Sequence, residues 1–164
     1  QSDSADIVEL ERGYNDEGIG GGPGRWGLAR FMSHIDWLHA RGKSVILEPY
    51  GLDEEKLAYE LAGYFLTRER DDAIASDYRA DPADFSSAWL TDLGAPLGHR
   101  ERWRGLWRRR YARGLVLLNE RGAEPRTVSL GSPHLGLDGE TAGAVTLPGG
   151  SGAVLVRVPP GQPQ

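Results

Sequence analysis

Carboxylate side chains recur where the predicted strands of this sequence end. Residues 6–16 read Asp-Ile-Val-Glu-Leu-Glu-Arg-Gly-Tyr-Asn-Asp, and Ile7 and Val8 favour a strand. Strand alternation places Glu9 and Glu11 on one face, with Glu11 where the strand stops. At the carboxyl end of a parallel strand, such a pair suits acid–base or nucleophilic chemistry. An edge strand whose charges discourage aggregation explains the same residues equally well.

Polar residues just beyond this strand complete the floor of a predicted pocket. They are Arg12, Tyr14, Asn15 and Asp16. A second predicted strand, residues 43–50, ends in Glu48 and Tyr50, and a weaker third strand, residues 72–77, ends in Asp77. One helix fills each interval, so the three strands are expected to be parallel and to place these carboxylates at one edge.

Two helical segments connect the predicted strands. Residues 25–41 carry apolar side chains at helical spacing, and residues 54–67 follow Asp53, a good N-cap. Before the first helix, residues 18–24 are mostly glycine. This loop lacks the Walker lysine and the spacing of a dinucleotide fingerprint, so it favours an active-site loop over a phosphate site.

The alternation of strands and helices stops after residue 77. Residues 78–102 form an irregular segment, in which Trp89 is suited to stacking on a sugar ring or to plugging the core. A strand period then predicts a small antiparallel β-domain. Its predicted strands are 103–111, 114–119, 127–130, 142–147 and 153–158. The arginines at 108–110 favour a solvated strand face over a nucleic-acid surface.

The composition bounds the class of protein. The 164 residues suffice for one ordinary domain or two small ones, and 39% hydrophobic content suits a globular chain. A net charge of -5 argues against nucleic acid as a partner, and the absence of cysteine excludes disulfides and thiolate chemistry. No apolar run reaches the roughly 20 residues of a membrane span. The abrupt start suggests a chain cut from a longer one, whose parent is expected to be a secreted bacterial protein.

Several segments, taken together, resemble one family. A strand ending Val-Glu-Leu-Glu and a strand ending Val-Ile-Leu-Glu, each followed by a helix, precede a weak third strand. The later segments that carry the resemblance are Asp-Leu-Gly-Ala-Pro-Leu-Gly (92–98), Trp-Arg-Arg-Arg-Tyr (107–111), Gly-Leu-Val-Leu-Leu-Asn (114–119) and residues 147–155. This order resembles the C-terminal portion of bacterial glycoside-hydrolase-like proteins, which have a TIM barrel and a trailing β-domain.

The resemblance implies an α/β part followed by an all-β part. Residues 1–98 would form the last three βα units of a partial (β/α)8 barrel, residues 99–160 a small antiparallel β-sandwich, and residues 161–164 a tail. The implied activity is hydrolysis of O-glycosidic bonds in a poly- or oligosaccharide by paired carboxylates. Glu11 is the first choice of catalytic residue, followed by Glu48, Glu9 and Asp77. The expected substrate-binding residues are Arg12, Tyr14, Asn15, Asp16, Trp26, Tyr50 and Trp89.

A complete barrel of this kind has eight strands, so three predicted strands imply a chain that is incomplete alone. The expected partners are a carbohydrate substrate and either a second copy of the chain or a missing N-terminal barrel half. No nucleic acid, membrane, metal or cofactor is expected. A non-catalytic carbohydrate-binding or purely structural fragment is the alternative.

Overall fold

A computed structural model describes residues 5–50, 53–69, 71–75 and 87–159. The first half forms a three-stranded parallel sheet in the order β1-β2-β3. Its strands are β1 (Ile7–Leu10), β2 (Ser44–Leu47) and β3 (Ala73–Ile74), and its helices are α1 (Leu28–His39) and α2 (Glu54–Thr67). Each helix connects two successive strands, so this half has the order β-α-β-α-β.

The register of the parallel strands determines which side chains share a face. Leu10 is paired with Leu47, and the Glu48 N–H donates to the Leu10 carbonyl oxygen at 3.0 Å. The next pair along the two strands is therefore Glu11 and Glu48. Paired residues of parallel strands project to the same side, so a register continued by one residue places these two carboxylates on one face.

Asp72 fixes the opposite end of this sheet, where β3 begins. Its carboxylate accepts hydrogen bonds from the Val45 N–H at 2.7 Å and from the Glu69 N–H at 2.9 Å. The His39 ring lies 2.8 Å from the same carboxylate. These contacts tie the ends of both helices to the starts of β2 and β3.

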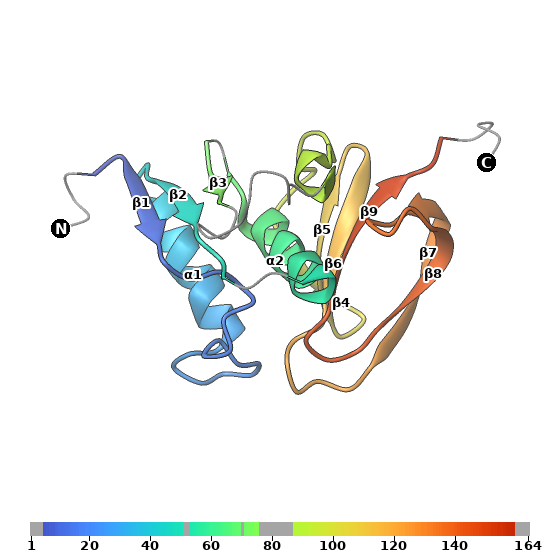
Figure 1. Ribbon diagram of the computed structural model, residues 1–164, viewed down its shortest axis with the longest axis horizontal. Helices are drawn as coiled ribbons and strands as arrows, with labels where there is room; N and C mark the ends of the chain where they lie inside the picture. Colours follow the sequence, from blue (N-terminus) through green and yellow to red (C-terminus); the bar gives the residue numbers. More distant parts are fainter. Residues whose placement is uncertain (1–4, 51–52, 70, 76–86, 160–164) are drawn as a thin grey trace.

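The second half of the chain forms one six-stranded antiparallel sheet in the order β4-β5-β6-β9-β7-β8. The strands are β4 (Glu101–Trp103), β5 (Leu106–Tyr111), β6 (Gly114–Leu118), β7 (Arg126–Leu135), β8 (Thr141–Leu147) and β9 (Gly152–Arg157). The β7–β8 ribbon bends where its register shifts between Ser129 and His134. Gly131, at this bend, has a φ of 77°, a conformation that favours glycine. The ribbon therefore curls back toward β9, as Figure 1 shows.

Helix α2 lies between the two sheets (Figure 1). It contacts β9, β6 and β5 on one side and α1 on the other, and all its residues from 59 to 67 are buried. Gly152 permits the close approach, because a Cβ there would lie 2.7 Å from the Cβ of Ala62. One hydrophobic cluster consequently includes residues of α1, α2, β2, β6 and β9.

Arg109 caps the C-terminal end of α2. Arg109 is 5% exposed, and its guanidinium donates to the carbonyl oxygens of Leu66 at 3.4 Å and Arg68 at 2.7 Å. The last carbonyl groups of a helix lack helical partners and carry partial negative charge, so a buried arginine is well placed there. The predicted solvated face is therefore wrong for Arg109, although Arg110 is exposed.

The predicted fold class, a partial (β/α)8 barrel followed by a β-sandwich, is wrong. The described residues contain two α-helices, and no described α-helix follows β3, which has two residues. Barrel helices form an outer ring, whereas α2 is covered by the antiparallel sheet. That sheet is single and curled, so it is not a sandwich of two sheets. The domain boundary at residue 98 stays a prediction.

Candidate functional site

The carboxyl ends of β1 and β2 meet near the N-terminal end of α2, and a polar cavity of about 230 Å³ lies there. The lining residues are Arg12, Gly13, Asn15, Asp16, Glu17, Tyr50 and Lys56. They present two cations, two carboxylates, an amide and a phenol ring to one space. We call this space the rim cavity.

Asn15 connects the two strand ends that border the rim cavity. Its side-chain Nδ2 donates to the Tyr50 carbonyl oxygen at 2.9 Å, so the residues after β1 are fixed to the residues after β2. Asp16 shapes the same loop, because its Oδ1 accepts the Gly18 N–H at 2.7 Å. Its other oxygen, Oδ2, lies 3.1 Å from the Arg12 Nε, and Arg12 is mostly exposed. An exposed ion pair of this kind contributes little stability, so Arg12 is free to reorient toward a ligand.

Glu60, a residue of helix α2, binds the backbone of the loop that follows β1. The side chain is fully buried, and its Oε2 accepts the Asn15 N–H at 2.7 Å. Burial raises the pKa of Glu60 to about 7, although the backbone N–H groups of Asn15 and Tyr14 and the charge of Arg121 oppose this rise. The loop backbone at Gly13 lies directly against the Glu60 carboxyl group, and a Cβ added at Gly13 would lie 2.4 Å from Oε2.

Arg121 holds the same loop from the antiparallel half of the molecule. Its guanidinium donates to the carbonyl oxygens of Asn15, Asp16 and Ile19. The neighbouring Glu120 accepts the Gly22 N–H at 3.0 Å. Both halves of the chain therefore bind the backbone of this loop, through Glu60 on one side and through Glu120 and Arg121 on the other, so the cavity floor is rigidly placed.

Neither Glu60 nor Arg121 is among the residues predicted from the sequence. Both act through contacts with residues 45 or more positions away, and a sequence pattern does not reveal such distant partners. For Glu60 one signal exists, because a glutamate stands between Tyr59 and Leu61 in a run of buried helix residues. Carboxylates are rarely buried without partners.

The predicted catalytic carboxylates lie outside the rim cavity. Glu9 and Glu11 are exposed on the open face of the parallel sheet, and Glu48 is half-buried on the same face. Glu11 and Glu48 are each the residue after the last register pair, Leu10 and Leu47, and neighbouring strands lie about 4.8 Å apart. Asp77 lies outside the described residues.

The predicted substrate-binding residues are only partly brought together. Arg12, Asn15, Asp16 and Tyr50 line the rim cavity. Tyr14 does not, because its fully buried ring packs over Gly63 and its hydroxyl lies 2.6 Å from Thr67 Oγ1.

The two predicted tryptophans also lie away from this cavity. Trp26 is 69% exposed in the loop before α1, with the Arg25 guanidinium 5.2 Å from its ring centre. Trp89 belongs to the 3₁₀ helix Ser87–Leu90 and lies near Arg68, at the opposite end of α2. Since α2 is about 21 Å long at 1.5 Å per residue, Trp89 and the rim cavity are separate.

The described residues contain neither a metal cluster nor a membrane-spanning helix. Within the described ranges, no group of three or more His, Cys, Asp or Glu residues is placed to hold a metal ion. Neither described α-helix is long and apolar enough to cross a membrane. The expected absence of a cofactor stays a prediction. A scan against models of known protein families and a search of curated proteins found no match.

Proposed function

We propose that this chain binds a saccharide in the rim cavity, as part of a protein of the glycoside hydrolase type. The observation that supports the proposal is the mixture of groups around one small space. Arg12 and Lys56 offer N–H donors, and Asp16 and Glu17 offer acceptors. Sugar hydroxyls donate and accept at once, so they can satisfy both kinds of group, whereas a simple ion satisfies only one.

Tyr50 provides the apolar part of such a site. Tyr50 is 37% exposed and lines the rim cavity beside the polar groups. Small-molecule sites combine aromatic surface with a few fixed polar groups. Here the fixed groups come from a loop that Glu60 and Arg121 hold in place, so little ordering cost remains for binding.

The test is calorimetric titration with a panel of mono- and oligosaccharides. Tyr50→Ala is expected to weaken binding by about tenfold or more, since it removes the aromatic surface of the site. Trp37→Ala is the matched control, because Trp37 is an exposed ring on α1 that does not line the rim cavity. Unchanged affinity in Tyr50→Ala, or equal losses in both variants, would contradict the proposal.

Hydrolysis by Glu11 and Glu48 is the second candidate function, and their positions directly after the last register pair, Leu10 and Leu47, favour it. Strands about 4.8 Å apart suit the separation of about 5–5.5 Å between the two carboxyl groups of retaining glycosidases. One group would protonate the glycosidic oxygen while the other attacks the anomeric carbon, so that the glycosidic C–O bond breaks and the alcohol leaves. Water would then hydrolyse the glycosyl ester, with the first group accepting its proton.

Aryl glycosides distinguish this candidate from binding alone. Glu11→Gln and Glu48→Gln are each expected to abolish product formation, whereas Glu9→Gln, on the same face two residues earlier along β1, is expected to retain it. Saccharide binding without product in the unaltered chain would exclude hydrolysis and leave the binding proposal intact.

A further inference from the structure

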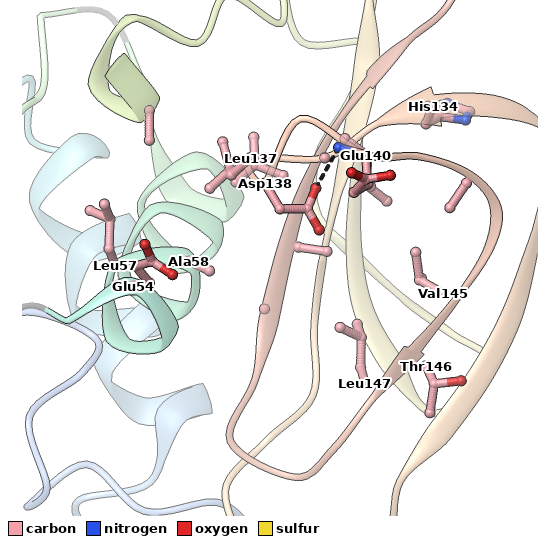
Figure 2. A pocket seen from close by; sticks show the side chains of 17 residues that line it. Glu54, Leu57, Ala58, His134, Leu137, Asp138, Glu140, Val145, Thr146 and Leu147 are labelled. Carbon is pink, nitrogen blue, oxygen red and sulfur yellow. Dashed lines mark hydrogen bonds between the residues drawn. The ribbon is translucent and has the colours of Figure 1, made fainter. Parts of the chain in front are cut away.

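A second cavity, of about 450 Å³, lies against the face of α2 that is opposite Lys56. Figure 2 shows side chains of α2 on one side, those of β8 on the other, and the tip of the β7–β8 ribbon between them. We call this space the ribbon cavity. Its apolar lining includes Leu57, Leu137, Val145, Leu147 and Val154.

One side of the ribbon cavity is an unpaired strand edge. The Asn119 N–H donates to the Ser151 carbonyl oxygen at 2.9 Å, and the Arg157 N–H donates to the Arg113 carbonyl oxygen at 2.7 Å. Hydrogen-bonded pairs alternate in antiparallel sheets, so the odd-numbered residues of β9 bond to β6. The N–H and C=O groups of the even-numbered residues therefore point away from β6.

No strand in the described part of the chain pairs with this edge at Gly152 or Val154. Strand β7 pairs with β9 only through Val156 and Arg157, because the ribbon bends back and reaches β9 at its far end. Gly152 and Val154 both line the ribbon cavity. Two backbone N–H groups and two carbonyl groups are thus available there for a further strand.

The mouth of the ribbon cavity is acidic. Glu54, Asp138 and Glu140 line it and are exposed, and none of its 17 lining residues is a lysine or arginine. The Oδ1 of Asp138 accepts the Glu140 N–H at 2.9 Å, which fixes the tip of the ribbon (Figure 2). His134 adds a buried polar atom to the lining, because its Nε2 has no hydrogen-bond partner among the described residues.

We propose that the ribbon cavity binds an extended peptide, in which an apolar side chain is flanked by lysine or arginine, as an added strand beside β9. The peptide backbone pairs with Gly152 and Val154, which is the mode of strand addition. The apolar side chain enters between Leu57 and Leu147. The flanking cations face the acidic mouth, so charge selects this partner over an acidic one.

Fluorescence anisotropy with labelled pentapeptides tests this proposal. Acetyl-Lys-Val-Leu-Val-Lys-amide is expected to bind, and its counterpart with glutamate at both ends is expected to bind at least about tenfold more weakly. A version with an N-methyl group on every residue, which has no N–H left on either edge to pair as a strand, is expected to lose binding as well. Equal binding of the N-methylated peptide, or no binding of the first peptide, would overturn the proposal. Full competition by hexylamine would instead indicate a small-amine site and would equally overturn it.

Variants of the chain locate the bound peptide. Glu54→Gln combined with Glu140→Gln is expected to weaken binding by about tenfold, since it removes two of the facing charges. Glu55→Gln is the matched control, because Glu55 lies in the same first turn of α2 but does not line the cavity. Val154→Pro removes one open N–H without removing a bond to β6. Circular dichroism identifies a variant that fails to fold, and a folded Val154→Pro with full affinity would contradict pairing at this edge.

Discussion

At the scale of single residues, the carboxyl group of Glu60 positions the loop of the rim cavity, although Glu60 does not line the cavity. Its Oε2 fixes the Asn15 backbone, and Gly13 is a glycine because any Cβ there would meet this carboxyl group. The other oxygen, Oε1, has no hydrogen-bond partner among the described residues. A proton on the group therefore removes a buried charge while leaving the bond to Asn15 in place.

This arrangement predicts a pH dependence of stability. Burial raises the pKa of Glu60 from its ordinary 4.5 to about 7, so the folded chain holds the proton more tightly than the unfolded chain. The resulting stabilisation is fully present below about pH 4.5 and is lost as the pH rises through about 7. The size of the shift corresponds to roughly 3 kcal/mol.

Glu60→Gln mimics the protonated acid and is expected to flatten this loss. Urea unfolding of the unaltered chain and of Glu60→Gln, between about pH 4.5 and 8, measures the free energy of unfolding of each. His39, whose pKa is raised by its hydrogen bond to Asp72, contributes a loss of the same sign in both proteins. The difference between the two curves therefore isolates Glu60, and a constant difference would contradict the assignment.

At the scale of secondary-structure elements, helix α2 joins the two halves of the fold. The sequence predicts its bounds correctly as 54–67, because Asp53 is a strong local start signal and its side chain accepts the Lys56 N–H at 2.9 Å.

The predicted strand 103–111 is in fact two strands, separated at Arg104 and Gly105, which have φ values of 52° and 84°. A positive φ at arginine has no clear sequence signal, so this turn was not predictable from residue type.

The packing of α2 on β9 predicts a strong effect for Gly152→Ala. The added Cβ would meet the Cβ of Ala62 and the backbone of α2, so the helix has to move away from the sheet. Overpacking of this kind costs about 1–3 kcal/mol of unfolding free energy. Gly143→Ala, on β8 with open space around it, is the control and is expected to change stability little. Thermal unfolding of the two variants decides between these outcomes.

At the scale of the whole molecule, the loop at the rim cavity belongs to both halves. Arg121 binds its carbonyl groups from a position 102 or more residues away. The predicted barrel fails for the same non-local reason, because periodicity identified the helices but did not reveal that α2 is covered by the antiparallel sheet. The sequence predicts four residues of the rim cavity, because they follow strands directly: Arg12, Asn15, Asp16 and Tyr50. The two residues that hold the loop, Glu60 and Arg121, could be identified only from the folded structure.

Loss of Arg121 is expected to loosen the rim loop without unfolding the protein. In Arg121→Ala, hydrogen exchange of the amides at residues 15–20 is expected to accelerate, while the amides of α1 keep their protection. Arg110→Ala, which removes an exposed arginine from β5, is the control. Saccharide affinity is expected to fall in parallel, since the loop would then have to be ordered on binding. Unchanged hydrogen exchange in Arg121→Ala would contradict this prediction and show that Glu60 holds the loop without Arg121.

The position of β9 has a consequence for how the protein forms. This strand follows every other described strand in the chain, yet it lies between β6 and β7 and packs on α2. During synthesis, the apolar face of α2 and the hydrogen-bonding edge of β6 are therefore made before the strand that packs on the first and pairs with the second. Late pairing over long sequence distances is slow and leaves such faces open to association. The nascent chain is thus expected to depend on chaperones until residues 152–157 have left the ribosome.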